Sequence, residues 1–187
     1  MAKPIMSDSP LKGNSMTDPI KHADDRGWIE RILLMVPGFR GYLRKDYRQE
    51  SDHLVRSAMA QRLEKGKADL DAYLRKVVDA GGIDALTIGE HVRGGCDRLI
   101  NKFKSAVRGY SGFFDYVQVR ENTLDEVYQL DLGVLNAVDA FTQYLGQLAT
   151  IGEASQASKS LEDCLTQIGD IETRFAKRHE LLEGIAH

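Results

Sequence analysis

Apolar residues recur at helical spacing along most of the chain, with polar and charged residues between them. Over residues 42–80 the apolar positions are three or four residues apart, which is the period of an amphipathic α-helix and predicts one long helix. These positions are Val55, Met59, Leu63, Gly66, Leu70, Leu74 and Val77. Because glycine costs a helix about 1 kcal/mol relative to alanine, Gly66 on this apolar stripe predicts that another helix crosses closely there, with a kink as the alternative.

Three further stretches have the same period. A helix over 83–108 is predicted by Val92, Cys96, Leu99, Ile100, Phe103 and Val107, although Gly94 and Gly95 fall off its stripe. A helix over 123–150 begins at Thr123, which forms a predicted capping box with Glu126. The last helix is marked by Leu161, Leu165, Ile168, Phe175 and Leu182. A short helix, Trp28–Val36, precedes them and ends at Pro37-Gly38.

These elements predict an all-α fold, an antiparallel bundle of four long helices with a short N-terminal helix and a disordered N-terminal tail. Residues 1–26 hold three of the four prolines and no apolar period, so we expect a disordered tail, followed by a single domain over 27–187. The segments PGFRGY (37–42) and GYSGFFDY (109–116) should be neighbours at the end of the bundle where the first long helix begins, here called the near end.

Composition excludes several functions. The net charge is -3, so no global field attracts nucleic acid, and we expect no nucleic-acid partner. We find no signal peptide and no apolar run of the ~20 residues that a spanning helix needs, so we expect a cytoplasmic protein, with association to a membrane surface as the alternative. Cys96 and Cys164 belong to no metal motif and are expected to be buried free thiols, with a disulfide between them as the alternative.

The chain has few residues in catalytic patterns. Its five histidines form no HExxH pair, and no phosphate-binding loop is present. We therefore expect no catalytic residues, no metal, no cofactor and no enzymatic activity. An enzyme or small-ligand binder with a site near Asp131 is the alternative.

Asp131 is the most unusual charged residue, since it lies in the middle of an apolar stripe between Tyr128 and Leu135. A buried carboxylate is costly unless it is paired. We predict a buried ion pair between Asp131 and Arg48, or failing that Arg44 or Arg62. The simplest role is to fix the register of the helices, and a ligand-binding or switch role is the alternative.

Aromatic and basic residues cluster at the near end and define a candidate interaction surface. Its residues are Trp28, Phe39, Arg40, Tyr42, Arg44, Tyr110, Phe113 and Phe114. The same residues could instead cap the core beside a solvated basic face, or meet lipid headgroups. The helix Trp28–Val36 has three interpretations: a cap on the bundle, an anchor for a partner or a second copy, and a shallow membrane insertion.

The stretches VPGFRGYLRKDYRQESDHLVR and GYSGFFDYVQV resemble a family of uncharacterised prokaryotic all-helical proteins, which open with a Pro-Gly-aromatic-x-Gly-Tyr junction before a charged helix. The resemblance covers residues 28–150. It implies a helical fold, assigns no activity, and implies a loose link to gene clusters for membrane-linked scaffold proteins. Our first hypothesis is a non-enzymatic protein-interaction or scaffold module that binds a protein partner or self-associates. A peripheral membrane protein anchored through Trp28–Val36 is the second.

Overall fold

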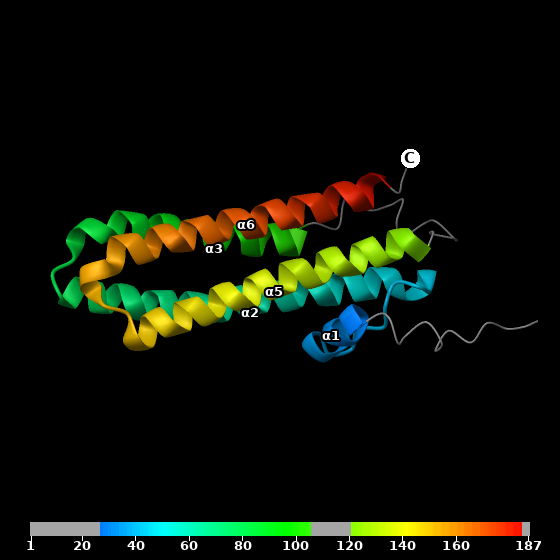
Figure 1. Cartoon of the computed structure of the whole chain (residues 1–187), viewed down its shortest axis with the longest axis horizontal. Coiled ribbons are helices and arrows are strands. Elements are labelled where there is room, and N and C mark those ends of the chain that lie inside the picture. The colour runs from blue at the N-terminus through cyan, green and yellow to red at the C-terminus, as the bar shows by residue number, and fades with distance from the viewer. Residues whose placement is uncertain (1–26, 106–120, 185–187) are drawn as a thin grey trace, which may run out of the picture.

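The structure, a computed structural model, describes residues 27–105 and 121–184, and within these ranges every regular element is helical (Figure 1). The elements are α1 (Gly27–Met35), α2 (Lys45–Asp79), the 3₁₀ turn η2 (Ile83–Ala85), α3 (Leu86–Ser105), α5 (Glu121–Ile151), the 3₁₀ turn η4 (Ala154–Gln156) and α6 (Ala157–Gly184). Consecutive long helices run in opposite directions. The predicted all-α antiparallel bundle of four long helices is therefore confirmed, while the predicted tail lies outside the described residues.

The order of the helices around the bundle is a finding of the structure. α2 packs against α3 and α5, and α6 packs against the same two helices, so α2 and α6 lie on one diagonal and α3 and α5 on the other (Figure 1). The neighbours α2 and α5 run in the same direction, as do α3 and α6. α1 packs on α5, alongside the half of the bundle that contains the near end.

Helix boundaries lie close to the predicted ones where glycine or proline residues end the helix. α2 ends as expected before the glycine pair, and Gly81 has a φ of 78°, the left-handed conformation that closes helices. The predicted capping box is wrong, because α5 already begins at Glu121 and Thr123 lies inside the helix. The predicted end of the second long helix, residues 106–108, lies outside the described residues.

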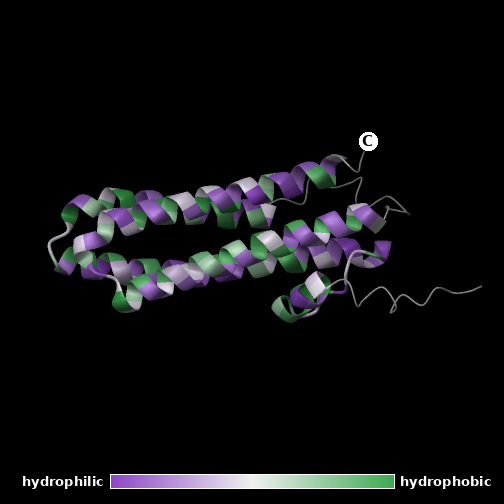
Figure 2. Ribbon diagram, in the orientation of Figure 1, coloured by the Kyte–Doolittle hydropathy of each residue, from purple (hydrophilic) through white to green (hydrophobic). Residues whose placement is uncertain are grey.

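The core follows the apolar stripes, and Figure 2 shows hydrophobic and hydrophilic residues alternating around each long helix, as expected for helices with one buried face. Gly66 confirms the predicted close crossing, because a Cβ atom there would lie 2.9 Å from the Cγ2 atom of Thr142 on α5. The placement of Gly95 off its stripe is wrong, because Gly95 is buried on the packed face of α3 and its missing Cβ would lie 2.9 Å from Ile168 on α6. These glycines allow the helix pairs to approach closely.

The PGFRGY junction is a tight turn between α1 and α2. Gly38 and Gly41 have φ values of 83° and 80°, which L-residues with side chains rarely adopt. A Cβ atom on Gly41 would also lie 2.8 Å from the hydroxyl of Tyr128. The two glycines therefore permit the chain to turn sharply, and the turn directs the side chain of Tyr42 into the bundle.

Candidate functional site

Six polar or charged side chains are buried in the near-end half of the bundle. They are Arg48, Ser51, Asp52, Arg56, Asp131 and Arg178. They come from three helices, α2, α5 and α6, and with Tyr42 they form what we call the ionic network. Buried charges are expensive unless they are paired and hydrogen-bonded, so the partners of each side chain decide what the network can do.

Arg178 lies at the centre of the ionic network. Its Nε atom donates to Oδ1 of Asp131 on α5, and its Nη2 atom donates to Oδ1 of Asp52 on α2 at 2.6 Å. Because α2 and α6 are diagonal partners, the pair with Asp52 crosses the interior of the bundle. The guanidinium of Arg178 thereby connects α6 to both α2 and α5.

The remaining carboxylate oxygens are occupied by two other donors. Arg56 donates from Nε to Oδ2 of Asp52 at 2.8 Å and from Nη1 to the carbonyl oxygen of Phe103 on α3 at 2.7 Å. The hydroxyl of Tyr42 donates to Oδ2 of Asp131 at 2.5 Å. Each of the four carboxylate oxygens therefore accepts a hydrogen bond, and all four long helices take part.

The turn before α2 is hydrogen-bonded to the ionic network and to Tyr128 on the side nearest α1. The backbone N–H of Tyr42 donates to the hydroxyl of Tyr128 at 2.7 Å, and Nε of Arg48 donates to the carbonyl oxygen of Tyr42 at 2.7 Å. Ser51 donates to the carbonyl oxygen of Gly41 at 3.0 Å. These bonds hold the turn in the geometry that its two glycines permit.

An aromatic cluster covers this turn. The rings of Tyr42 and Tyr128 have centroids 5.1 Å apart, and Trp28 of α1 lies 5.2 Å from Tyr128. Phe39 contacts the Tyr42 ring edge-on at 5.4 Å. The four rings join α1, the turn and α5 beside the buried network.

Burial dominates the electrostatics. It raises the pKa of the Asp131 carboxyl, whereas the positive charge of Arg178 and the hydrogen bonds from Arg178 and Tyr42 lower it. Burial also raises the pKa of the Tyr42 hydroxyl well above its ordinary value of 10.0, and the neighbouring Asp131 charge acts in the same direction. Tyr42 is thus held as a neutral donor to Asp131.

The prediction for Asp131 is confirmed in its burial and wrong in its partner. Asp131 is fully buried, but its cationic partner is Arg178 of α6 and not Arg48, which donates to a backbone carbonyl. Arg44 is exposed and pairs with Asp46, while Arg62 pairs with Asp139. The register of α6 against α5 decides which arginine pairs with Asp131. The pattern of apolar residues along one helix carries no information about this register.

The candidate interaction surface is corrected in part. Phe39 and Tyr42 are buried, so they belong to the core and not to a surface. Trp28 is half-buried on Tyr128, whereas Arg40 and Arg44 are exposed as predicted. The other three predicted members, Tyr110, Phe113 and Phe114, lie outside the described residues. The near-end aromatics that can be placed therefore cap the core.

Four members of the ionic network were missed by the sequence analysis, namely Ser51, Asp52, Arg56 and Arg178. A signal was present: Arg178 follows Phe175 by three residues and precedes Leu182 by four, which places it on the buried stripe of α6. Asp52 likewise precedes Val55 by three residues. A charged residue three or four positions from buried apolar residues of its helix is predicted to be buried. The same reasoning predicted the burial of Asp131.

α1 displays leucines to solvent. Ile32 is buried against the bundle, and on the other side of the helix Leu33 and Leu34 are 48% and 86% exposed. Leu43, beside the buried Tyr42, is 53% exposed. We call Leu33, Leu34 and Leu43 the exposed leucines. α1 thus packs on the bundle, as one interpretation expected, and still leaves an apolar side free for a contact.

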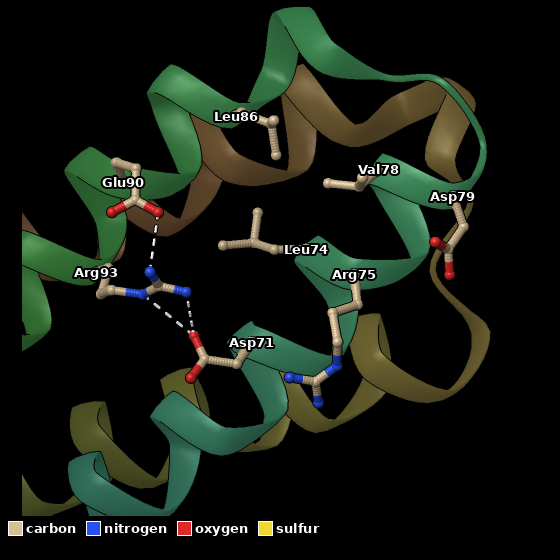
Figure 3. A pocket seen from close by; sticks show the side chains of 8 residues that line it. All are labelled: Asp71, Leu74, Arg75, Val78, Asp79, Leu86, Glu90 and Arg93. Carbon is tan, nitrogen blue, oxygen red and sulfur yellow. Dashed lines mark hydrogen bonds and ion pairs between the residues drawn. The ribbon is translucent and has the colours of Figure 1, made fainter.

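A cavity of about 310 Å³ lies between α2 and α3 at the opposite end of the bundle (Figure 3). It is lined by Asp71, Leu74, Arg75, Val78, Asp79, Leu86, Glu90 and Arg93. Arg93 lies between two carboxylates, with Nη2 at 2.5 Å from Asp71 and Nη1 at 2.9 Å from Glu90. Because Arg93 is already paired with both carboxylates at a partly exposed rim, we assign no ligand to this cavity.

The two cysteines are free and buried, as predicted. Burial raises the pKa of Cys96 to about 11 and of Cys164 to about 12, so both remain protonated thiols at neutral pH. Among the described residues, no group of three histidine, cysteine or acidic side chains is arranged to hold a metal ion. No helix in residues 27–105 and 121–184 is long and apolar enough to cross a membrane.

Comparison of the chain with protein-family models found no matching model, and comparisons with curated proteins and with solved structures found no match either. The family resemblance of the PGFRGY region therefore stays a prediction. What can be inferred about function rests on the fold, the ionic network and the exposed residues.

Tyr42→Phe tests the electrostatics of the network. The folded-state pKa of Tyr42 is raised, so its contribution to stability is fully present below the unfolded pKa of about 10 and is lost as the pH rises above it. We expect the wild type to exceed Tyr42→Phe in free energy of unfolding by about 1.5–3 kcal/mol at pH 7, because the hydroxyl donates to a charged group. Above pH 10 this difference should shrink by about 1.4 kcal/mol per pH unit.

Urea denaturation of both proteins at pH 7, 10 and 11 measures the effect. Taking the difference between the two proteins cancels the titration of the other tyrosines and the cysteines. A difference that stays constant to pH 11 would contradict the assignment of Tyr42 as a buried neutral donor.

Proposed function

We propose that this chain is a non-enzymatic interaction module that uses the exposed leucines of α1 and the adjoining turn as its contact surface. The observation that carries the proposal is Leu34, which is 86% exposed on a helix whose opposite side is packed against α5. Leu33 lies next to it, and Leu43 follows within the same short segment. Burying exposed leucines against a partner is favourable by roughly 1.5–3 kcal/mol for each fully buried side chain.

The ionic network supports a structural role for the interior. Asp131 is fully buried, and its two oxygens accept hydrogen bonds from Arg178 and Tyr42. A catalytic or ligand-binding carboxylate needs an accessible oxygen in a concave site. We therefore favour an interaction module over the alternative of an enzyme or small-ligand binder at Asp131.

A peripheral membrane role is the second candidate, and one observation favours it. Residues 27–45 hold four basic residues and one acidic residue near the exposed leucines, and basic residues beside apolar ones are a combination that binds anionic lipid surfaces. Two of the four, Arg40 and Arg44, are paired with Glu50 and Asp46. Trp28 is a poorer membrane anchor than the sequence suggested, because it packs on Tyr128. In this interpretation Leu33 and Leu34 would enter the interface instead.

Site-specific photocrosslinking in living cells tests the proposed function. A photoreactive residue is placed at Leu34, and a control is placed at Glu162, an exposed position on α6. We expect adducts from position 34 and few from position 162, because only position 34 lies on the contact surface. Adducts at neither position, or equally at both, would contradict the proposal. The mass of the adduct separates a protein partner, a second copy of the chain and a lipid.

A further inference from the structure

We propose that α1 is an arm that opens from the bundle as a unit, and that a latch at Arg62 holds it in the docked position. The latch consists of Arg62 on α2, Met35 at the end of α1 and Asp139 on α5. Figure 1 shows α1 at the edge of the bundle, outside the four long helices. When the latch opens, α1 leaves α5 while the long helices stay folded.

The latch joins three helices through one guanidinium. Nη2 of Arg62 donates to the carbonyl oxygen of Met35 at 2.7 Å, and Nε of Arg62 lies 2.7 Å from Oδ1 of Asp139. Met35 is the last residue of α1, where carbonyl groups lack a donor within the helix and the helix dipole places partial negative charge. The side chains of Arg62 and Asp139 are 23% and 33% exposed, so water can replace the bonds of the latch when it opens.

The apolar contact beneath α1 is small. Ile32 is the one residue within α1 that is fully buried, and the buried Val36 follows directly after the helix. Trp28 contacts the ring of Tyr128 and is only half-buried. A helix of nine residues is too short to be stable in water by itself, so α1 depends on these contacts and on the latch. Segments with few buried apolar residues open at a lower free energy than the core.

The boundary between the arm and the bundle lies at Pro37 and Gly38. From Gly41 onward the turn is hydrogen-bonded to side chains of the ionic network and to Tyr128. Gly38 is exposed and has a φ of 83°, and glycine adopts positive and negative φ values about equally well. Rotation at Gly38 therefore moves α1 and leaves Tyr42 in the bundle.

Opening changes the apolar surface that α1 presents to other molecules. In the docked position Ile32 and Val36 are covered by the bundle, whereas Leu33 and Leu34 are exposed. Opening uncovers the first two side chains and lets all four move together. The latch thus restrains the contact surface proposed above, a consequence that rests on the proposed function, whereas the arm itself does not.

Hydrogen exchange of the full chain, followed by mass spectrometry of its peptides, tests the arm. In the wild type we expect the amides of residues 31–36 to be protected, and to exchange faster than those in the middle of α5, because α1 opens without the bundle. Exchange as slow as that of the slowest amides of α5 would show that α1 opens only with the whole fold. Amides without protection would show that α1 is not docked. Either result would overturn the inference.

Arg62→Met removes the latch and keeps the aliphatic stem of the side chain. The amides of α1 should then exchange about tenfold faster or more, because the lost hydrogen bond has a charged donor, while exchange in α6 stays the same. Arg174→Met is the control, since Arg174 forms an ion pair with Asp170 on the surface of α6 and should not affect α1. Unchanged exchange of α1 in Arg62→Met, or an equal acceleration in every helix, would overturn the latch.

Gly38→Ala tests the arm without touching the latch. A Cβ atom on Gly38 would lie 3.6 Å from Leu54, an ordinary contact, so alanine fits in the available space. The docked backbone has a φ that alanine rarely adopts, so docking becomes less favourable and α1 should exchange roughly fivefold faster or more. Gly169→Ala is the matched control, because the space around a Cβ atom there is open. Equal exchange of α1 in both glycine variants would contradict a boundary at Gly38.

Crosslinking separates this inference from the proposed function. If α1 exchanges as expected and position 34 gives no adduct in cells, the arm stands and the proposed function fails. If position 34 gives adducts and α1 exchanges only with the bundle, the proposed function stands and the arm fails. Where both hold, Arg62→Met should raise the yield of adducts at position 34, and an unchanged or lower yield would overturn the restraint by the latch.

Discussion

Replacing Arg178 with methionine is expected to lower the free energy of unfolding by about 3–5 kcal/mol, the cost of leaving a buried charge without its partner. Methionine keeps the length of the aliphatic stem but removes the guanidinium that donates to Asp131 and Asp52. Asp131 would keep only the neutral hydroxyl of Tyr42, and Asp52 only Arg56. Bulk solvent cannot reach the carboxylates to replace the lost donors, because both side chains are fully buried.

The loss should depend on pH in a defined direction. Without the positive charge of Arg178, the folded-state pKa of Asp131 rises further, and a proton can neutralise the orphaned carboxylate at mildly acid pH. The difference in stability between wild type and variant should therefore be smaller at pH 5 than at pH 8. Chemical denaturation can be followed by the fluorescence of Trp28, the single tryptophan, and by helical circular dichroism.

Arg174→Met is the matched control. Arg174 lies one turn earlier on α6 and pairs with Asp170, but both side chains are about half exposed. Exposed i,i+4 pairs on a helix contribute about 0.3–0.5 kcal/mol, so the control should change stability by about 0.5 kcal/mol at most. Equal effects of the two substitutions would show that Arg178 is not the centre of the network.

Asp131→Ala should destabilise the fold by a similar amount, about 3–5 kcal/mol. The alanine removes the acceptor of the Tyr42 hydroxyl and half of the negative charge that surrounds Arg178. Asp139→Ala is the control on the same helix, since Asp139 pairs with Arg62 at a site about one-third exposed and should cost less than about 1 kcal/mol. A loss below about 0.5 kcal/mol for Asp131→Ala would contradict the buried pair.

A double-mutant cycle separates the pair from its surroundings. The double variant with both Asp131→Ala and Arg178→Met leaves neither member of the pair buried without the other. Its cost should therefore be smaller than the sum of the two single costs by about 2 kcal/mol or more, within the range measured for contacting residues. Strict additivity would mean that the two residues act on stability independently.

The position of the network in the bundle explains what it adds to the fold. An apolar layer at this level would accept several helix registers, whereas Arg178 must meet acceptors on α2 and α5 at the same time. Removing both members of a buried pair can cost little stability, so the contribution of such a pair lies partly in selecting one arrangement. Here the arrangement that is selected places α2 diagonally from α6.

The same arrangement fixes the turn before α2. Tyr42 reaches Asp131 only because Gly38 and Gly41 adopt left-handed backbone conformations, and Tyr128 occupies the space that a side chain on Gly41 would need. The turn carries Leu43 on its outer side. The turn before α2 thus contributes Tyr42 to the buried network and Leu43 to the proposed contact surface.

The sequence by itself determined the helices, their approximate ends and the all-α class, because these depend on local spacing of apolar residues and on glycine and proline. It also identified Asp131 as buried and Gly66 as a close crossing, since each lies on an apolar stripe. Both conclusions need only the rotation of one helix, which is the same in every helix.

Only the tertiary structure decided which helices are neighbours, that Arg178 rather than Arg48 meets Asp131, and that Phe39 and Tyr42 are core residues. These facts depend on the register and order of separate helices, and many orders bury the same apolar stripes. The choice among them comes from contacts between residues far apart in sequence, such as Asp52 and Arg178, which no local pattern contains.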